Sequence, residues 1–141
     1  MNDHITNTLT RREAERLLAS EVATIAGRTP DDRLRWTGTT KDLMEALYVA
    51  FLTATLRDDE GNGLSFLHIV RHCCTVLHTR IPLNPHDVAR RAMNRKGMKS
   101  LPFLDRYLWQ KEQHPHIRPF CRLVAGLEQP PLEPDEACPG T

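Results

Sequence analysis

The stretch KDLMEALYVAFLTATL, residues 41–56, decides the fold class of this chain. Apolar residues cover most of the circumference that this stretch would have as a helix, and Thr39 or Thr40 can cap its beginning. A helix that is apolar nearly all round is normally enclosed by other elements. We therefore expect it at the centre of the domain, where it packs through Leu43, Met44, Leu47, Tyr48, Phe51, Leu52 and Leu56.

The segments on either side show helical periodicity with recognisable start and stop signals. Thr10 and Glu13 form a capping box, and Gly27 offers the end of the helix that they begin. Ser65 is suited to cap a later helix, and Asn84 precedes a proline at a favoured first helical position. Helices are predicted over residues 11–26, 41–56, 65–79, 85–96 and 101–113, and a short sixth one within 114–126.

Composition indicates one ordinary globular domain rather than two. The chain has 141 residues, of which 40% are hydrophobic and 26% charged. Leucine outnumbers valine and isoleucine, and no segment alternates polar with apolar residues over the length of a strand. We predict an all-α fold: an orthogonal bundle of five to six helices that contains a helix-turn-helix.

The chain divides into three parts by composition. Residues 1–35 are interpreted as an N-terminal helical arm and loop, and residues 36–127 as the helical domain. Residues 128–141 are rich in proline and contain four acids and no base, which is typical of a disordered tail.

Several classes of protein receive no support from the sequence. There is no run of 18 apolar residues and the N-terminus is polar, so a cytoplasmic protein without membrane contact is expected. No nucleophile–base pair or glycine-rich phosphate loop is visible, so we expect neither an enzyme nor a small-molecule substrate. The four cysteines follow no CxxC pattern and are expected as reduced thiols.

Two pairs of residues have the spacing of metal ligands on a helix. His68 and His72 stand one turn apart, and Cys74 and His78 repeat the spacing on another face. Because the two pairs do not converge and no further ligands are evident, we expect no metal and no other cofactor.

Charge is unevenly distributed along the chain. The net formal charge is +1, but residues 84–127 hold nine bases and three acids, an excess of +6. Residues 1–83 sum to −1 and residues 128–141 to −4. A basic block over two predicted helices suggests contact with a nucleic-acid backbone, whereas the simpler interpretation is a solvated basic face.

The helix predicted over 85–96 sharpens this suggestion because its two sides differ. Val88, Ala89, Ala92 and Met93 share one side, and the opposite side carries Arg and Asn. Arginine suits guanine and phosphate, and asparagine suits adenine, so such a helix could read the major groove as the second helix of the helix-turn-helix. The candidate DNA-binding residues are Arg90, Arg91 and Asn94 for base edges, and Arg95, Lys96 and Lys99 for phosphates.

The few aromatic residues fall mainly at core-like positions. They are expected to pack rather than to form an exposed platform for single-stranded nucleic acid. Those assigned to packing are Trp36, Tyr48, Phe51, Phe66, Phe103, Tyr107 and Trp109.

Two stretches resemble a known family over about residues 34–110. One is Trp36-Thr37-Gly38 followed by Leu43, Glu45 and Tyr48, and the other is Arg95-Lys96 followed by Phe103-Leu104-Asp105 and Leu108. They are similar to the C-terminal domain of RteC, a regulatory protein of bacterial conjugative transposons. The resemblance implies a helical domain that contains a helix-turn-helix and controls transcription of mobile-element genes. The chain departs from the family in having only some 35 residues in place of the family's N-terminal domain, and in the position of Lys41.

The sequence therefore predicts a bacterial DNA-binding transcriptional regulator whose partner is double-stranded DNA. A homodimer is one open alternative, since a specific operator usually has two half-sites. Another is a non-enzymatic protein-interaction module that uses the apolar face of helix 11–26, and the sequence alone does not choose between that use and intramolecular packing.

Overall fold

The computed structural model describes residues 9–95 and 101–127, and within them the chain is almost entirely helical. The prediction of an all-α fold is confirmed. The expected sixth helix is a single 3₁₀ turn, and two strands of two residues each complete the fold. The helices are α2 (Arg11–Ala26), α3 (Thr40–Leu52), α4 (Phe66–Val76), α5 (Pro85–Met93) and α6 (Phe103–Gln113); the 3₁₀ turns are η1 (Pro30–Asp32) and η2 (Cys121–Leu123), and the strands are β1 (Arg35–Trp36) and β2 (Val124–Ala125).

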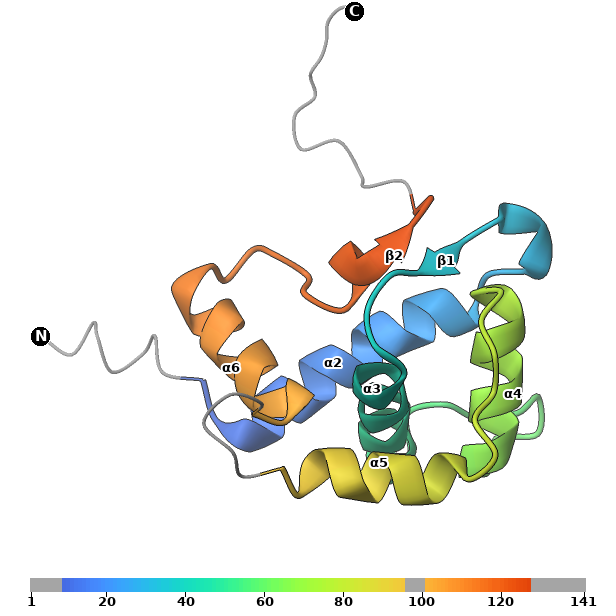
Figure 1. Ribbon diagram of the computed structural model, residues 1–141, viewed down its shortest axis with the longest axis horizontal. Helices are drawn as coiled ribbons and strands as arrows, with labels where there is room; N and C mark the ends of the chain where they lie inside the picture. Colours follow the sequence, from blue (N-terminus) through green and yellow to red (C-terminus); the bar gives the residue numbers. More distant parts are fainter. Residues whose placement is uncertain (1–8, 96–100, 128–141) are drawn as a thin grey trace, which may run out of the picture.

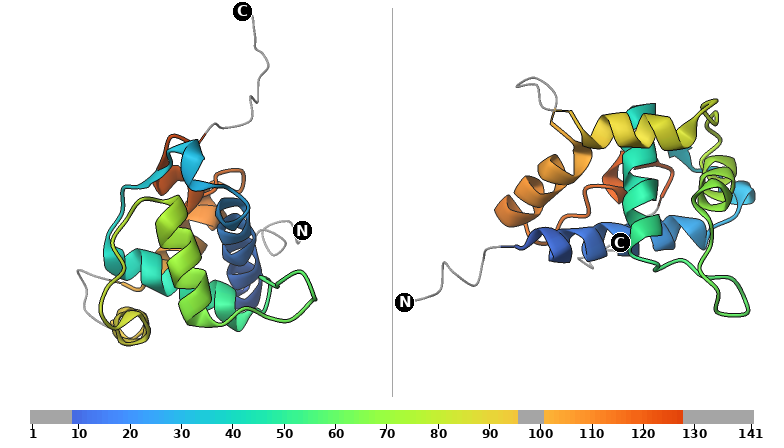
Figure 2. Two further views of the ribbon diagram at one scale, coloured as in Figure 1. Left: turned by 90° about the vertical axis from the view of Figure 1, so that its right-hand side faces the viewer. Right: turned by 90° about the horizontal axis from the view of Figure 1, so that it is seen from below.

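Helix α3 is the central element, as its apolar circumference predicted. Figure 1 looks nearly along its axis, while α2 and α5 run across the picture on opposite sides of it. The view from below in Figure 2 shows α3 crossing between these two helices at a steep angle. From Asp42 to Ala50 only Tyr48 is not fully buried. The bundle is therefore orthogonal, with α3 enclosed by the other helices.

Helix α2 belongs to the same core and is not a separate arm. Its side chains Leu18, Val22 and Ile25 are fully buried and join one hydrophobic cluster with those of α3, α4 and α6. This apolar face was the docking surface of the interaction-module alternative. Because the face is already covered within the molecule, it is not available for a partner.

Local capping side chains mark the beginnings of α2, α3 and α4, whereas Asn84 before α5 makes no capping hydrogen bond. Thr10 and Glu13 form the expected capping box, and the Ser65 hydroxyl accepts a hydrogen bond from the His68 N–H. The ends are less well predicted: α3 stops at Leu52, four residues early. Ala54 has a left-handed backbone with φ of 56°, which turns the chain out of the helix.

Strand β2, near the end of the described chain, pairs with β1, which comes shortly before α3. They are antiparallel, with Trp36 opposite Val124, and Thr37 donates its N–H to the Leu123 carbonyl. The Trp36 indole lies on Phe120, with ring centroids 5.1 Å apart, and its N–H donates to the Thr39 carbonyl. The Trp36 ring therefore covers the chain just before α3 begins.

Gly38 has no room for a side chain beneath this ring. A Cβ at this position would lie 2.8 Å from Cζ2 of Trp36, inside van der Waals contact. We expect Gly38→Ala to lower the free energy of unfolding by about 1–3 kcal/mol, because the indole must shift from Phe120. Urea unfolding measures this, with Gly63→Ala as the control, since a Cβ there would meet nothing within 4 Å. Equal stability of the two variants would contradict the prediction.

Helices α4 and α5 form the expected helix pair, but the connection is longer than the five-residue turn implied by the sequence. Because α4 ends at Val76, residues 77–84 join the two. The chain leaves α4 through His78, whose φ is 53° and whose Nδ1 hydrogen-bonds to the Leu34 carbonyl. Helix α5 then packs mainly on α3 and less on α4.

Candidate nucleic-acid interface

Helix α5 has the two-sided character that the sequence predicted. Ala89 and Ala92 are fully buried against the core, while Arg90, Arg91 and Asn94 are exposed. Small residues on the inner side let the helix lie close to α3 (Figure 2). The outer side consequently forms an edge of the molecule, and three of the six candidate residues share it.

The exposed arginines of α5 form only weak ion pairs, or none, with other described residues. The Arg91 guanidinium is 3.1 Å from the Asp87 carboxylate one turn earlier, and its side chain remains 80% exposed. Such a pair within one helix is worth only about 0.3–0.5 kcal/mol. Arg90 has no ion pair with any residue that the structure describes. Both side chains can therefore turn toward an anionic partner at little cost.

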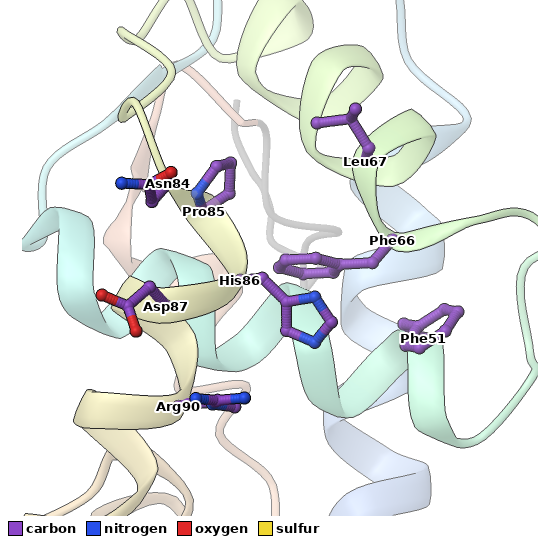
Figure 3. A pocket seen from close by; sticks show the side chains of 8 residues that line it. All are labelled: Phe51, Phe66, Leu67, Asn84, Pro85, His86, Asp87 and Arg90. Atoms are coloured by element: carbon purple, nitrogen blue, oxygen red, sulfur yellow. The ribbon is translucent and has the colours of Figure 1, made fainter.

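A groove with aromatic walls adjoins the beginning of α5. It has a volume of about 590 Å³ and lies between α5, the start of α4 and the end of α3. Figure 3 shows the rings of Phe66 and His86 next to each other in its wall, with centroids 5.4 Å apart. Phe51 lies beyond them and Arg90 stands at the rim. The candidate interface is thus a cationic helix face bordered by an apolar groove.

Arg95 points into the molecule, unlike its neighbours on α5. Its side chain is 17% exposed, and its Nη2 donates to Asp42 at 3.1 Å and to Glu45 at 3.2 Å. Arg106 of α6 also donates to Asp42, at 2.6 Å. Two arginines thus neutralise two buried acids of α3, and this cluster ties α5 and α6 to the central helix. The sequence predicted that Arg95 contacts phosphate, but in the structure its side chain has this structural role instead.

Glu45 supplies the cap that helix α6 otherwise lacks. The residue at the N-cap position, Pro102, has no side chain that can accept a hydrogen bond. The Glu45 carboxylate instead accepts from the N–H groups of Phe103 and Leu104, at 2.8 and 2.9 Å, and is 1% exposed. A negative charge at a helix N-terminus is favourable because it meets the positive end of the helix dipole. The two stretches that carry the family resemblance therefore contact each other directly.

Part of the basic block over residues 84–127 is neutralised by acids from elsewhere in the chain. Arg95 and Arg106 pair with Asp42 and Glu45, which the sequence sum assigned to a different segment. Lys111 donates to the carbonyls of Pro115 and Ile117. The excess of +6 therefore does not form one continuous face, and the exposed face of α5 is the part relevant to a partner.

A third buried acid, Glu21 of α2, connects α2 by hydrogen bonds to α6 and to the segment at Cys121. Its carboxylate accepts hydrogen bonds from the Tyr107 hydroxyl and from the Cys121 N–H, the latter at 2.9 Å. Burial raises the pKa of Glu21, although these two hydrogen bonds oppose the shift. Burial also raises the pKa of Tyr107, with the adjacent Glu21 adding to the effect.

Sequence reasoning missed these three acids, although a signal was present. Asp42 and Glu45 lie on a helix predicted to be apolar nearly all round, and Glu21 lies between Leu18 and Val22 on the apolar stripe of α2. An acid at such a position must be buried, and a buried acid requires donors. Only the packed structure shows which donors these are.

Three of the four residues considered as metal ligands are buried or hydrogen-bonded within the chain, while the fourth, His68, is exposed. His72 and His78 hydrogen-bond to the carbonyls of Ala26 and Leu34, and Cys74 is buried. Burial raises the pKa of the Cys74 thiol to about 11 and that of Cys73 to about 12, which keeps both protonated at neutral pH. Across residues 9–95 and 101–127, no three His, Cys, Asp or Glu side chains are grouped to hold a metal ion.

Leu52 and Trp109 were both expected in the core but lie on the surface, and Leu52 is 58% exposed. The Trp109 side chain was assigned to packing, but the residue is 62% exposed on the outer side of α6. Lys96 and Lys99, the remaining candidate phosphate contacts, and the tail over 128–141 lie outside the described residues.

Comparison with protein-family models, with curated proteins and with solved structures found no match for this chain. In the part of the chain that the structure describes, no helix is both long enough and apolar enough to span a membrane.

Proposed function

We propose that this protein is a non-enzymatic DNA-binding regulator whose helix α5 enters the major groove. The observation that carries the proposal is the arrangement of α5, in which Arg90, Arg91 and Asn94 are exposed together while Ala89 and Ala92 seat the helix on α3. A short helix held on a rigid support, with arginine and asparagine on its free side, suits recognition of base edges.

The ion-pair cluster behind α5 adds to this proposal. Arg95 fixes the end of the helix to Asp42 and Glu45, which positions the outer face relative to the core. A reading helix needs such support, because its side chains must reach base edges in a defined register. On this proposal Arg90, Arg91 and Asn94 contact bases, and Lys96 and Lys99 contact phosphates.

The resemblance to the RteC C-terminal domain is a second support. It assigns the target to DNA upstream of bacterial mobile-element genes, and its two motif stretches meet at the bonds from Phe103 and Leu104 to Glu45. The proposed protein is accordingly cytoplasmic and acts by binding rather than by catalysis.

Replacement of Arg90 tests this proposal. We expect Arg90→Ala to weaken binding to duplex DNA from upstream of the protein's own gene by about 1–3 kcal/mol, or roughly 5–150-fold, through loss of a base contact. Fluorescence anisotropy at several salt concentrations, with the upstream duplex and a random duplex, measures this. Binding to random DNA should change much less.

Arg35→Ala is the matched control, because Arg35 is an exposed arginine on β1, on the side of the molecule away from α5 (Figure 1). Its affinity should stay within about twofold of the wild type, since non-contacting surface charges act only through a screened field. If both variants bind like the wild type, or both lose affinity equally, α5 is not the reading helix.

One observation favours a second candidate function, a protein-interaction module. Leu67 beside the aromatic groove is 43% exposed, and Leu83 just before α5 is 98% exposed. A contiguous apolar patch on a protein surface is often covered by a partner or by a second copy. Sedimentation without and with DNA separates the two candidate functions. A protein-interaction module would form oligomers in the absence of DNA. Leu83→Ser would reduce these oligomers, and added DNA would not change them.

A further inference from the structure

A second hollow lies on α6, apart from the candidate DNA-binding face. It has a volume of about 510 Å³ and is enclosed by α6 and by the chain that returns from it toward β2. Its volume falls within the usual range for small-ligand sites. The residues that give it chemical character are Arg106, Trp109, Gln110, His114 and Arg122.

The hollow carries positive charge without any carboxylate in its lining. The Arg122 side chain forms no ion pair or hydrogen bond with another described residue; its backbone N–H donates to the Arg118 carbonyl. Arg106 is held in place by Asp42, yet its side chain stays 42% exposed. An anion entering the hollow would therefore meet one uncommitted guanidinium and one that is already oriented.

An exposed indole stands beside these cations. Trp109 lies one helical turn after Arg106, and its 62% exposure leaves a large apolar ring in water. Gln110 near the end of α6 and His114, the residue that follows the helix, also line the hollow and present polar groups to it. A planar ring stacked on Trp109 would remove this apolar surface from water while its edge faces hydrogen-bonding side chains.

We propose that this hollow binds a nucleotide. The base stacks on the Trp109 indole, the phosphate pairs with Arg122 and Arg106, and Gln110 hydrogen-bonds to the edge of the base. This site goes beyond the proposed reading of duplex DNA by α5, because it uses other residues on another helix. Its ligand is a free nucleotide rather than a nucleic-acid strand, since the hollow has the volume of a small-ligand site.

Titration of the full chain with AMP tests the proposal, with tryptophan emission and calorimetry as readouts. The chain has two tryptophans, and Trp36 is fixed by its bond to the Thr39 carbonyl, so saturable quenching would report chiefly on Trp109. We expect Arg122→Ala to weaken AMP binding about tenfold or more, because a charge-assisted contact is lost. Calorimetry should show a similar loss for Trp109→Leu, whose exposed position leaves the fold intact by circular dichroism.

Matched ligands and a control variant complete the experiment. Arg35→Ala should bind AMP like the wild type, and adenosine and inorganic phosphate should each bind about tenfold more weakly than AMP. The proposal is overturned if AMP causes no saturable change, if adenosine binds as well as AMP, or if Arg122→Ala and Arg35→Ala behave alike. It is equally overturned if a single-stranded oligonucleotide binds the hollow and AMP does not.

Discussion

Replacement of Glu45 by alanine is expected to lower the free energy of unfolding by about 3–5 kcal/mol, enough to unfold a marginal domain. The substitution leaves the N–H groups of Phe103 and Leu104 buried without an acceptor. It also deprives Arg95 of one of its two carboxylates. Urea unfolding followed by circular dichroism measures the loss.

Two further variants define the cause of that loss. Glu45→Gln retains one acceptor oxygen but no charge, so its stability should fall between those of the wild type and Glu45→Ala. Glu60→Ala removes an exposed acid from the turn after α3 and should change stability by no more than about 0.5 kcal/mol. A loss below about 1 kcal/mol for Glu45→Ala would mean that the cap and the ion pair contribute little.

Glu21 is the second site at which a single change should have a large effect. We expect Glu21→Ala to lose about 2–4 kcal/mol, because the Tyr107 hydroxyl and the Cys121 N–H both lose their buried acceptor. Glu21→Gln should lose less, since the amide keeps one acceptor and its NH₂ group can donate to the Tyr107 oxygen.

The pH dependence of the wild type relative to Glu21→Gln separates the charge from the hydrogen bonds. Burial raises the pKa of Glu21 in the folded state above its ordinary value of 4.5, so the folded chain binds this proton more tightly than the unfolded chain. The stability contributed by this linkage is present below pH 4.5 and is lost as the pH rises through the folded pKa. The wild type should therefore lose stability relative to Glu21→Gln as the pH rises above 4.5.

Unfolding curves of the two proteins between pH 4 and 8 test this, because the contributions of all other groups cancel in the difference. A difference that stays constant with pH would show that the folded and unfolded chains hold this proton equally. A difference of opposite sign would show that the hydrogen bonds to Glu21 outweigh its burial.

The helices were predictable because their signals act over a few residues. The capping box of Thr10 and Glu13 and the cap at Ser65 appear where the sequence placed them. The end of α3 was misplaced because an apolar residue such as Leu56 fits a helical pattern without requiring a helix. The chain turns at Ala54 instead and leaves Leu52 largely exposed.

In the candidate site, too, the features set by local sequence were predicted and those set by distant elements were not. Exposure of Arg90, Arg91 and Asn94 followed from the helical period, which places them opposite Ala89 and Ala92. Trp109 was wrongly assigned to the core because helical periodicity gives the direction of a side chain but not whether another element covers it. The chain that returns from α6 toward β2 leaves the Trp109 ring exposed.

By itself the sequence determined that this chain is an all-α domain, where most of its helices begin, and which side of α5 faces outward. These properties depend on hydrogen bonds and side-chain spacing within one or two helical turns. Only the tertiary structure decided that Glu45 caps α6, that Arg95 turns inward and that the basic block is partly neutralised. Those pairings join residues 50 or more positions apart, and they exist because packing around α3 brings buried charges within hydrogen-bond distance of their partners.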